Sequence, residues 1–521
     1  MNTNDAINKL REVSYSDSTT DIWQTIIYVL EQTNPIQHNT LEPYCKNIIN
    51  KRLKHFERKH VLTCTELDEP LPVWLKLSNS IKINITSQTR TNYKQLTQHI
   101  NSDVFTNLKN LDLSYCNIYA SNSELIAPAK LPKGLTALNL KGNIVGDTWL
   151  NSWLDKNKTN NIKTLNLSGT LAGEKTLNLI NTNSSTSKIE HLDLSFNRIS
   201  TQSISTLKPK SQHNGKIKKL NLGNNSFNNS IWEILNKNPL FSDLEHLSLS
   251  NNKISNPKQA NTQGLNKLLG LNLQNCQIND IDCEIINHIK KVKWLELHRN
   301  NISNKGLETI LSQNKQLKYI GLGNTNISEN KIHEILNTQN IKNLQGLDIS
   351  YCNIKSKAIQ KLVKNNHFKN IKLLNISNTH IETQCLDMIL DATYLPELKH
   401  LAVGGHSTNE HQLEKILSRD TGLTSLFIDN TPQDTNWLQA LKNIKPTKQL
   451  KHLIIQNCKI TDAILKKLTE NLNFKSLKIL ELPENEITHS GISDLINHET
   501  INHLEQLNLE FNPLGDKYSA P

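Results

Sequence analysis

The residues of this chain that could act as nucleophiles, general acids or bases, or metal ligands are spread along its whole length. None of the fragments GxSxG, HExxH, GxxxxGK[ST] and GxGxxG, which are typical of serine nucleophiles, zinc sites and phosphate-binding loops, occurs in the 521 residues. The eight cysteines form no CxxC pair, and the nineteen histidines are dispersed. We therefore predict a non-enzyme with no catalytic residue, no metal site and no cofactor.

A different chemistry, the recognition of a protein surface, is indicated by aromatic and charged residues in the middle of the chain. Tryptophan, tyrosine and arginine are the residues most enriched at the energetic centres of protein interfaces. The candidate partner-binding residues are Trp294, Glu296, His298, Arg299, Tyr319 and Tyr351. The alternative for a large side chain such as Trp294 is that it only packs on an adjacent strand.

The elements that would position these residues follow from an internal repeat. LKNLDLSYCNI at 108–118 returns as LQGLDISYCNI at 344–354, and the same eleven-residue template occurs sixteen times. The copies are spaced by 24 to 28 residues, most often by 27. They begin at Leu108, Leu135, Ile162, Ile189, Ile217, Leu244, Leu268, Val292, Leu317, Leu344, Ile371, Leu398, Leu423, Leu450, Leu477 and Leu504.

Each place of the template has a physical requirement. Leucine at the fourth place, with Ile320 the one exception, and Leu, Ile or Val at the sixth predict a short strand with one face buried against neighbouring repeats. The ninth place holds asparagine seven times, cysteine four times, threonine four times and histidine once. We expect this side chain to satisfy backbone groups where the chain leaves the strand, which gives four cysteines a structural role.

Helical spacing of apolar residues follows each strand, as in TDAILKKLTENL at 461–472. This pattern resembles leucine-rich repeat proteins of the ribonuclease-inhibitor-like subclass. The resemblance implies an α/β solenoid, a horseshoe with a parallel β-sheet on its concave face and helices on its convex face. Helices pack about 8–10 Å apart and strands about 4.8 Å apart, so the stack must curve.

The ends of the chain lack the template and divide it into segments. We expect a helical N-terminal region or cap at 1–80, a transition or capping repeat at 81–107, sixteen repeats at 108–514 and a tail at 515–521. A cap is required because the first repeat of a solenoid would otherwise expose its core. A separate binding module in the N-terminal region is the alternative.

The net charge of +11 makes an anionic partner worth considering. Lysine fills the second template place in nine copies, and KRLKHFERKH at 51–60 is the densest basic run. A row of lysines most often keeps a solenoid soluble, and the glutamates Glu481, Glu484, Glu505 and Glu510 argue against a grip on a phosphate backbone. Nucleic acid and membranes are therefore not expected partners, although an RNA- or membrane-associated protein that uses the basic rim stays an alternative.

The predicted function is a protein–protein interaction scaffold that binds its partner on the concave surface. The composition, rich in asparagine, lysine and isoleucine, resembles leucine-rich repeat effectors of intracellular bacterial pathogens. That resemblance implies a reducing, cytoplasmic location and delivery into a host cell by a secretion system that needs no signal peptide. The alternative is a substrate-recognition subunit of a larger enzyme complex, such as a ubiquitin ligase. Cys385 and Asp387 resemble the Cys-x-Asp nucleophile motif of effector ligases, but they fall in a repeat helix with no additional domain.

Overall fold

The computed structural model describes most of the chain. The described residues are 1–14, 18–33, 35–53, 59–63, 75, 77–85, 90–157, 162–182, 188–207, 216–254, 262–336, 341–391, 393–405, 408–418, 422–431, 435–442, 449–471, 476–498, 501 and 503–515. Parts of two predicted segments, residues 54–58 of the basic run and 516–521 of the tail, lie outside these ranges.

The chain divides into two compact units. Unit 1 comprises Met1–Phe227 and Lys237–Leu244, and unit 2 comprises Asn228–Asn236 and Glu245–Pro521. Both units contain repeats, so the predicted solenoid at 108–514 is shared between them. Each repeat of a solenoid contacts only its neighbours, so no single core holds the whole array together.

Unit 1 begins with helices and continues as a parallel sheet in chain order, each strand pairing with the next from β1 to β7. Its strands are β1 Lys59–Thr63, β2 Ser80–Asn84, β3 Asn110–Asp112, β4 Ala137–Asn139, β5 Thr164–Asn166, β6 His191–Asp193 and β7 Lys219–Asn221. Its helices are α1 Thr3–Val13, α2 Thr19–Glu31, α3 Pro35–Arg52, α5 Arg90–Ile100, α6 Asp147–Lys156, α7 Glu174–Thr182 and α8 Thr201–Ile204. The segment 1–80, which we expected to be helical, thus also supplies β1. Strand β2 lies ahead of the first template copy and pairs with β3, which lies inside that copy.

Unit 2 repeats one strand and one helical return, and its sheet is again parallel in chain order from β8 to β18. Its strands are β8 His246–Ser248, β9 Gly270–Asn272, β10 Trp294–Glu296, β11 Tyr319–Gly321, β12 Gly346–Asp348, β13 Leu373–Asn375, β14 His400–Gly404, β15 Ser425–Asp429, β16 His452–Gln456, β17 Ile479–Glu481 and β18 Gln506–Asn508.

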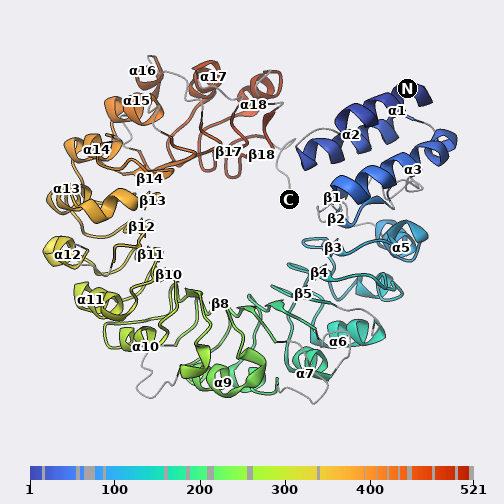
Figure 1. Cartoon of the computed structure of the whole chain (residues 1–521), viewed down its shortest axis with the longest axis horizontal. Coiled ribbons are helices and arrows are strands. Elements are labelled where there is room, and N and C mark those ends of the chain that lie inside the picture. The colour runs from blue at the N-terminus through green and yellow to red at the C-terminus, as the bar shows by residue number, and fades with distance from the viewer. Residues whose placement is uncertain are drawn as a thin grey trace. The chain divides into compact units, whose positions relative to one another are not determined.

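The helices of unit 2 lie outside its curved sheet, and the strands line the inner side, as Figure 1 shows for α10 to α18. They are α9 Ile231–Lys237, which ends at the unit boundary, α10 Cys283–His288, α11 Asn304–Gln313, α12 Glu329–Ile335, α13 Ser356–Val363, α14 Thr383–Leu390, α15 Glu410–Ser418, α16 Trp437–Leu441, α17 Asp462–Asn471 and α18 His489–Ile496. The sixteen template copies coincide with strands β3 to β18. The predicted α/β solenoid is therefore confirmed.

The buried side of each repeat is the one that the template predicts. In β10 and the residue after it, Leu295 and Leu297 are fully buried, while Trp294 and Glu296 face the inner surface. At the ninth place, Asn300 donates from Nδ2 to the carbonyls of Leu273 and Leu297 at 2.8 and 2.9 Å. Such paired groups join consecutive repeats because each buried carbonyl needs a donor.

Cysteine at the ninth place acts in the same way. The Cys276 thiol donates to the Leu249 carbonyl at 3.1 Å, and the Cys352 thiol donates to the Leu322 carbonyl at 3.2 Å. Burial raises the pKa of Cys276 to about 12, so its thiol stays protonated and able to donate. Seven of the described cysteines are buried, and none of them forms a disulfide. No helix in the described part of the chain is long and apolar enough to span a membrane.

Candidate functional site

Two aromatic side chains stack on the inner surface of unit 2. Trp294 in β10 and Tyr319 in β11 are register partners, and their ring centroids lie 5.5 Å apart with the planes inclined by 18°. Tyr319 lies over Gly346 of β12, where an added Cβ would come within 2.6 Å of the Tyr319 ring. Trp294 stays 42% exposed. The pair is therefore a preformed aromatic surface, in which Tyr319 packs over Gly346 and Trp294 is exposed to solvent.

A charged triad, Glu296, His298 and Asp348, lies beside the aromatic pair. His298 Nδ1 is 2.6 Å from Glu296 Oε2, and His298 Nε2 is 3.2 Å from Asp348 Oδ2. His298 and Asp348 belong to repeats separated by one further repeat, in which the outward places hold Gly321 and Gly323. A Cβ at Gly321 would lie 2.0 Å from Glu296 Oε2, and one at Gly323 would lie 2.6 Å from His298 Cδ2. The glycines thus leave the space through which the imidazole reaches Asp348.

Two members of the triad, His298 and Asp348, favour their charged forms at neutral pH. Burial acts to lower the pKa of His298, but Asp348 and Glu296 outweigh it and raise that pKa from 6.5 to about 9. Burial acts to raise the pKa of Asp348, whereas His298 and Ser350 lower it below 3.8 overall. Burial, followed by the charges of Glu296 and Asp348, raises the pKa of Tyr319. The half-buried imidazolium thus lies between the Glu296 and Asp348 carboxyl groups, beside the aromatic pair.

A second network begins at Tyr351 and crosses to β15. The Tyr351 hydroxyl donates to Asp429 Oδ2 at 3.2 Å, although 78 residues separate them. Asn378 donates to the same oxygen at 2.9 Å, and Asn430 donates to it at 3.0 Å. Burial raises the pKa of Asp429 against the opposing effect of these donors. Tyr351 remains 53% exposed, so the hydrogen bond from its hydroxyl to Asp429 orients a ring that is accessible to solvent.

Arg299 and Tyr351 share an unusual backbone conformation. Both stand at the eighth template place with a φ of 55°, in the left-handed region. Arg299 is exposed, and its charge acts to lower the Tyr351 pKa, which burial and Asp429 raise overall. The arginine therefore lies near enough to interact electrostatically with the tyrosine hydroxyl.

The six predicted site residues fall into two kinds of environment. Trp294, Arg299 and Tyr351 present large exposed side chains. Tyr319, Glu296 and His298 are half-buried, the tyrosine in the stack with Trp294 and the other two in an ion pair. Sequence reasoning missed the residues that support them, namely Asp348, Asp429, Gly321, Gly323 and Gly346. The signal available was the run of glycines at outward places directly after the copy that carries the large side chains. Partner binding by the six residues stays a prediction.

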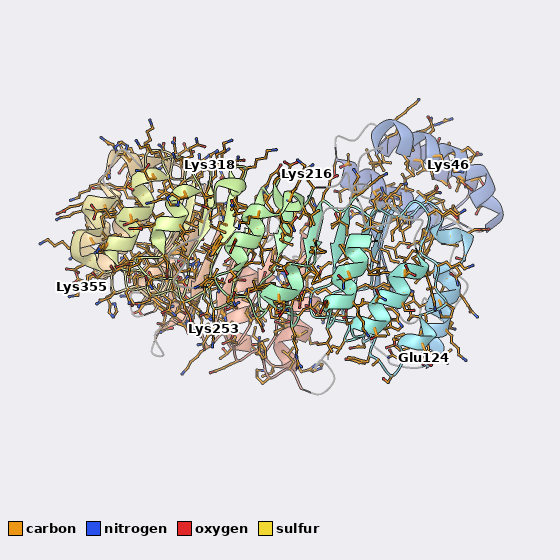
Figure 2. The ribbon with its side chains drawn as sticks, turned by 90° about the horizontal axis from the view of Figure 1, so that it is seen from below. Lys46, Glu124, Lys216, Lys253, Lys318 and Lys355 are labelled. Carbon is orange, nitrogen blue, oxygen red and sulfur yellow. The ribbon has the colours of Figure 1, made fainter. Side chains whose placement is uncertain are left out.

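The lysines of the second template place pair with glutamates in both units, since Lys478 of unit 2 lies 3.2 Å from Glu505. In unit 1, Lys163 and Lys218 both pair with Glu190, at 3.4 and 2.8 Å. In unit 2, Lys318 and Lys372 line a surface depression together with Lys342, Asn343, Gln345, Asn370 and Glu397. Within unit 2, Lys318 lies on one edge of the array, and Lys253 and Lys355 lie on the opposite edge (Figure 2).

Cys385 and Asp387, which sequence reasoning considered for catalysis, are poorly suited to it. Cys385 is buried, and burial together with Glu382 raises its thiol pKa to about 12, which suppresses the nucleophilic thiolate. Asp387 pairs instead with Lys415 at 2.8 Å. In the described ranges, no group of three or more His, Cys, Asp or Glu side chains could hold a metal ion.

Comparison with known proteins identifies the repeat. One family model described as Leucine Rich Repeat matches residues 188–209, and another described as Leucine Rich repeat matches residues 500–517. A solved internalin from Listeria monocytogenes shares 17% identity with a TM-score of 0.41, over 78% of this chain and 95% of that chain. TLR13 in complex with ssRNA13 shares 18% identity with a TM-score of 0.38, over 87% of this chain and 63% of that chain. No curated protein sequence matches significantly.

Proposed function

We propose that this chain, which is a leucine-rich repeat protein, is a non-catalytic scaffold that binds a partner protein through the inner strand surface of unit 2. The observation that carries the proposal is the stacked pair of Trp294 and Tyr319, with the tryptophan 42% exposed. Large aromatic groups that are already ordered lose little conformational entropy on binding, so they suit the centre of an interface.

The charged triad supports this role because its contacts hold the polar side chains beside the aromatic pair in fixed positions. The His298 imidazole pairs with the Glu296 and Asp348 carboxyl groups, close to the aromatic pair. Arg299 and Tyr351 extend the surface along the edge at which the strands end. The proposed contact therefore combines an aromatic centre with charged and polar groups around it, which is the arrangement of a specific protein interface.

Affinity capture from a lysate tests the proposal, using the full chain as bait. We expect partners captured by the native chain to be lost with Trp294→Ala plus Tyr319→Ala, because both changes remove apolar area from the proposed centre. Tyr28→Ala is a matched control, since Tyr28 is also an exposed aromatic residue, 45% exposed, on helix α2 in unit 1. The same set of partners from all three baits would discard this surface.

The cellular setting is a further part of the proposal. The asparagine- and lysine-rich composition supports an effector that a bacterium delivers into a host cell, and the seven described cysteines, all free, fit a reducing compartment. Fusion of the chain to a reporter that is modified only in host cytoplasm would test delivery. A reporter that stays unmodified during infection would argue against it.

An anionic partner is a second candidate, favoured by the depression that Lys318, Lys342 and Lys372 line in unit 2. Binding of RNA or anionic vesicles through lysines would weaken steeply as salt rises, because counterions are released on binding. Binding that does not change with salt, or that survives Lys318→Glu plus Lys372→Glu, would exclude this candidate.

A further inference from the structure

Four exposed apolar side chains follow consecutive strands of unit 1. Tyr115 and Phe196 are 59% and 61% exposed, and Ile144 and Leu171 are 48% and 42% exposed. They stand at the eighth or tenth place of the repeats that begin at Leu108, Leu135, Ile162 and Ile189, so they share one edge of the sheet. We call these four residues the edge patch. Contiguous exposed apolar groups of this kind mark interaction sites more often than scattered ones do.

The backbone disfavours the aromatic residues of the edge patch. The eighth place has a positive φ in all sixteen copies, and ten of these places hold glycine or asparagine, which accept that conformation. Tyr115 and Phe196 adopt a φ of 54° there, and Leu171 adopts 59° at the tenth place. Each such residue has an energetic cost relative to glycine. Burial does not offset this cost, because all three side chains are exposed.

Two glycines make the edge patch continuous. Gly142 and Gly169 occupy the eighth place of the two middle repeats, and an added Cβ at Gly142 would lie 2.4 Å from the Tyr115 ring. Tyr115 therefore lies across the neighbouring repeat. The tenth place of these two repeats holds Ile144 and Leu171, whereas in the other fourteen copies it holds no leucine, isoleucine, valine, phenylalanine, tyrosine or tryptophan. At about 4.8 Å per strand, the patch extends for about 15 Å.

Two basic side chains adjoin the edge patch, while the exposed carboxylates Glu124 and Glu174 lie further along the chain after β3 and β5. Lys141 Nζ lies 5.4 Å from the centroid of the Tyr115 ring, and Arg198 is exposed two residues beyond Phe196. The strand carboxylates Asp112 and Asp193 already accept hydrogen bonds, from the Ser114 and Ser195 backbone amides. A ligand that covered the apolar groups would thus meet two cations, one at each end.

We propose that the edge patch binds a short acidic segment of a partner protein, which places two or three apolar side chains over about 15 Å and carboxylates against Lys141 and Arg198. Four side chains offer far less than the roughly 800 Å² per partner that a stable interface between folded domains buries, which favours a linear segment over a globular face. The patch follows strands β3 to β6 of unit 1. It is separate from the inner surface of unit 2 and does not depend on the function proposed for it.

A random twelve-residue peptide display library, selected on the full chain, tests the proposal. We expect enriched peptides to combine Asp or Glu with at least two large apolar residues. Tyr115→Asn plus Phe196→Asn should weaken their binding at least about tenfold, and Lys141→Glu should weaken it in the same direction. The control is Phe511→Asn, an 80% exposed aromatic residue with a φ of 59° at the eighth place of the last repeat. This variant should bind the peptides as the native chain does.

Several outcomes would overturn the proposal. Basic peptides, no enrichment, or peptides that bind the native chain and the double variant equally would each contradict it. Thermal melting separates binding from packing, since asparagine accepts the left-handed conformation and the double variant should melt no lower than the native chain. A melting temperature lowered by several degrees would instead assign Tyr115 and Phe196 a structural role.

Discussion

Replacing His298 by glutamine should lower the stability of this protein by an amount that depends on pH in a defined way. The native imidazolium lies between Glu296 and Asp348, at 2.6 and 3.2 Å. Folding raises its pKa from 6.5 to about 9, so the stabilisation is fully present below pH 6.5 and is lost as the pH rises through about 9. The pKa of Asp348 is lowered, so its contribution is present above pH 3.8 and is lost as the pH falls through its lower folded value.

The size of the effect follows from that difference in pKa. At about 1.4 kcal/mol per pH unit, a rise from 6.5 to about 9 corresponds to about 3 kcal/mol of stability in the charged state. This is an upper value, because burying two carboxylates and a cation offsets part of the attraction. Replacing His298 alone leaves Asp348 buried and Glu296 half-buried without their cation, which costs more than replacing all three groups by apolar residues would.

Urea denaturation of the full chain at about pH 6 and about pH 10 measures the effect. The His298→Gln variant should lose up to about 3 kcal/mol of unfolding free energy at the lower pH, and the loss should shrink at the higher pH. Adding Glu296→Gln to this variant should recover stability, because it removes one of the two unpaired charges. A loss of equal size at both pH values, or no recovery in the double variant, would refute the assigned protonation state.

Two further predictions concern the framework of the site. Gly321→Ala should destabilise unit 2 by about 1–3 kcal/mol and alter Trp294 fluorescence, because the new Cβ would lie 2.0 Å from Glu296 Oε2; unchanged melting and emission would contradict this geometry. Asn300→Ala should cost about 2–4 kcal/mol in urea denaturation because it breaks bonds to buried backbone groups, while Asn300→Cys should cost less because cysteine fills this place in other repeats. Equal costs for the two Asn300 variants would contradict the role given to the ninth place.

Much of the framework could be predicted because it obeys local rules. The fourth and sixth places must be aliphatic in every repeat, and the ninth must reach backbone carbonyls, so the strands and the inward faces follow from the period alone. The exposed tryptophan could be anticipated from its outward place in the template. The same reasoning gave no sign that the array divides into two units near residue 228, because neighbouring repeats look alike on either side of that point.

The sequence by itself therefore determined the repeat, the parallel strands and the side chains that face inward, since each depends on contacts between adjacent repeats. Only the tertiary structure decided what the outward side chains do. His298 reaches Asp348 across Gly321, and Tyr351 reaches Asp429 across 78 residues. Such contacts depend on side-chain length and on which neighbouring places are empty, and they become visible only when the strands lie side by side in space.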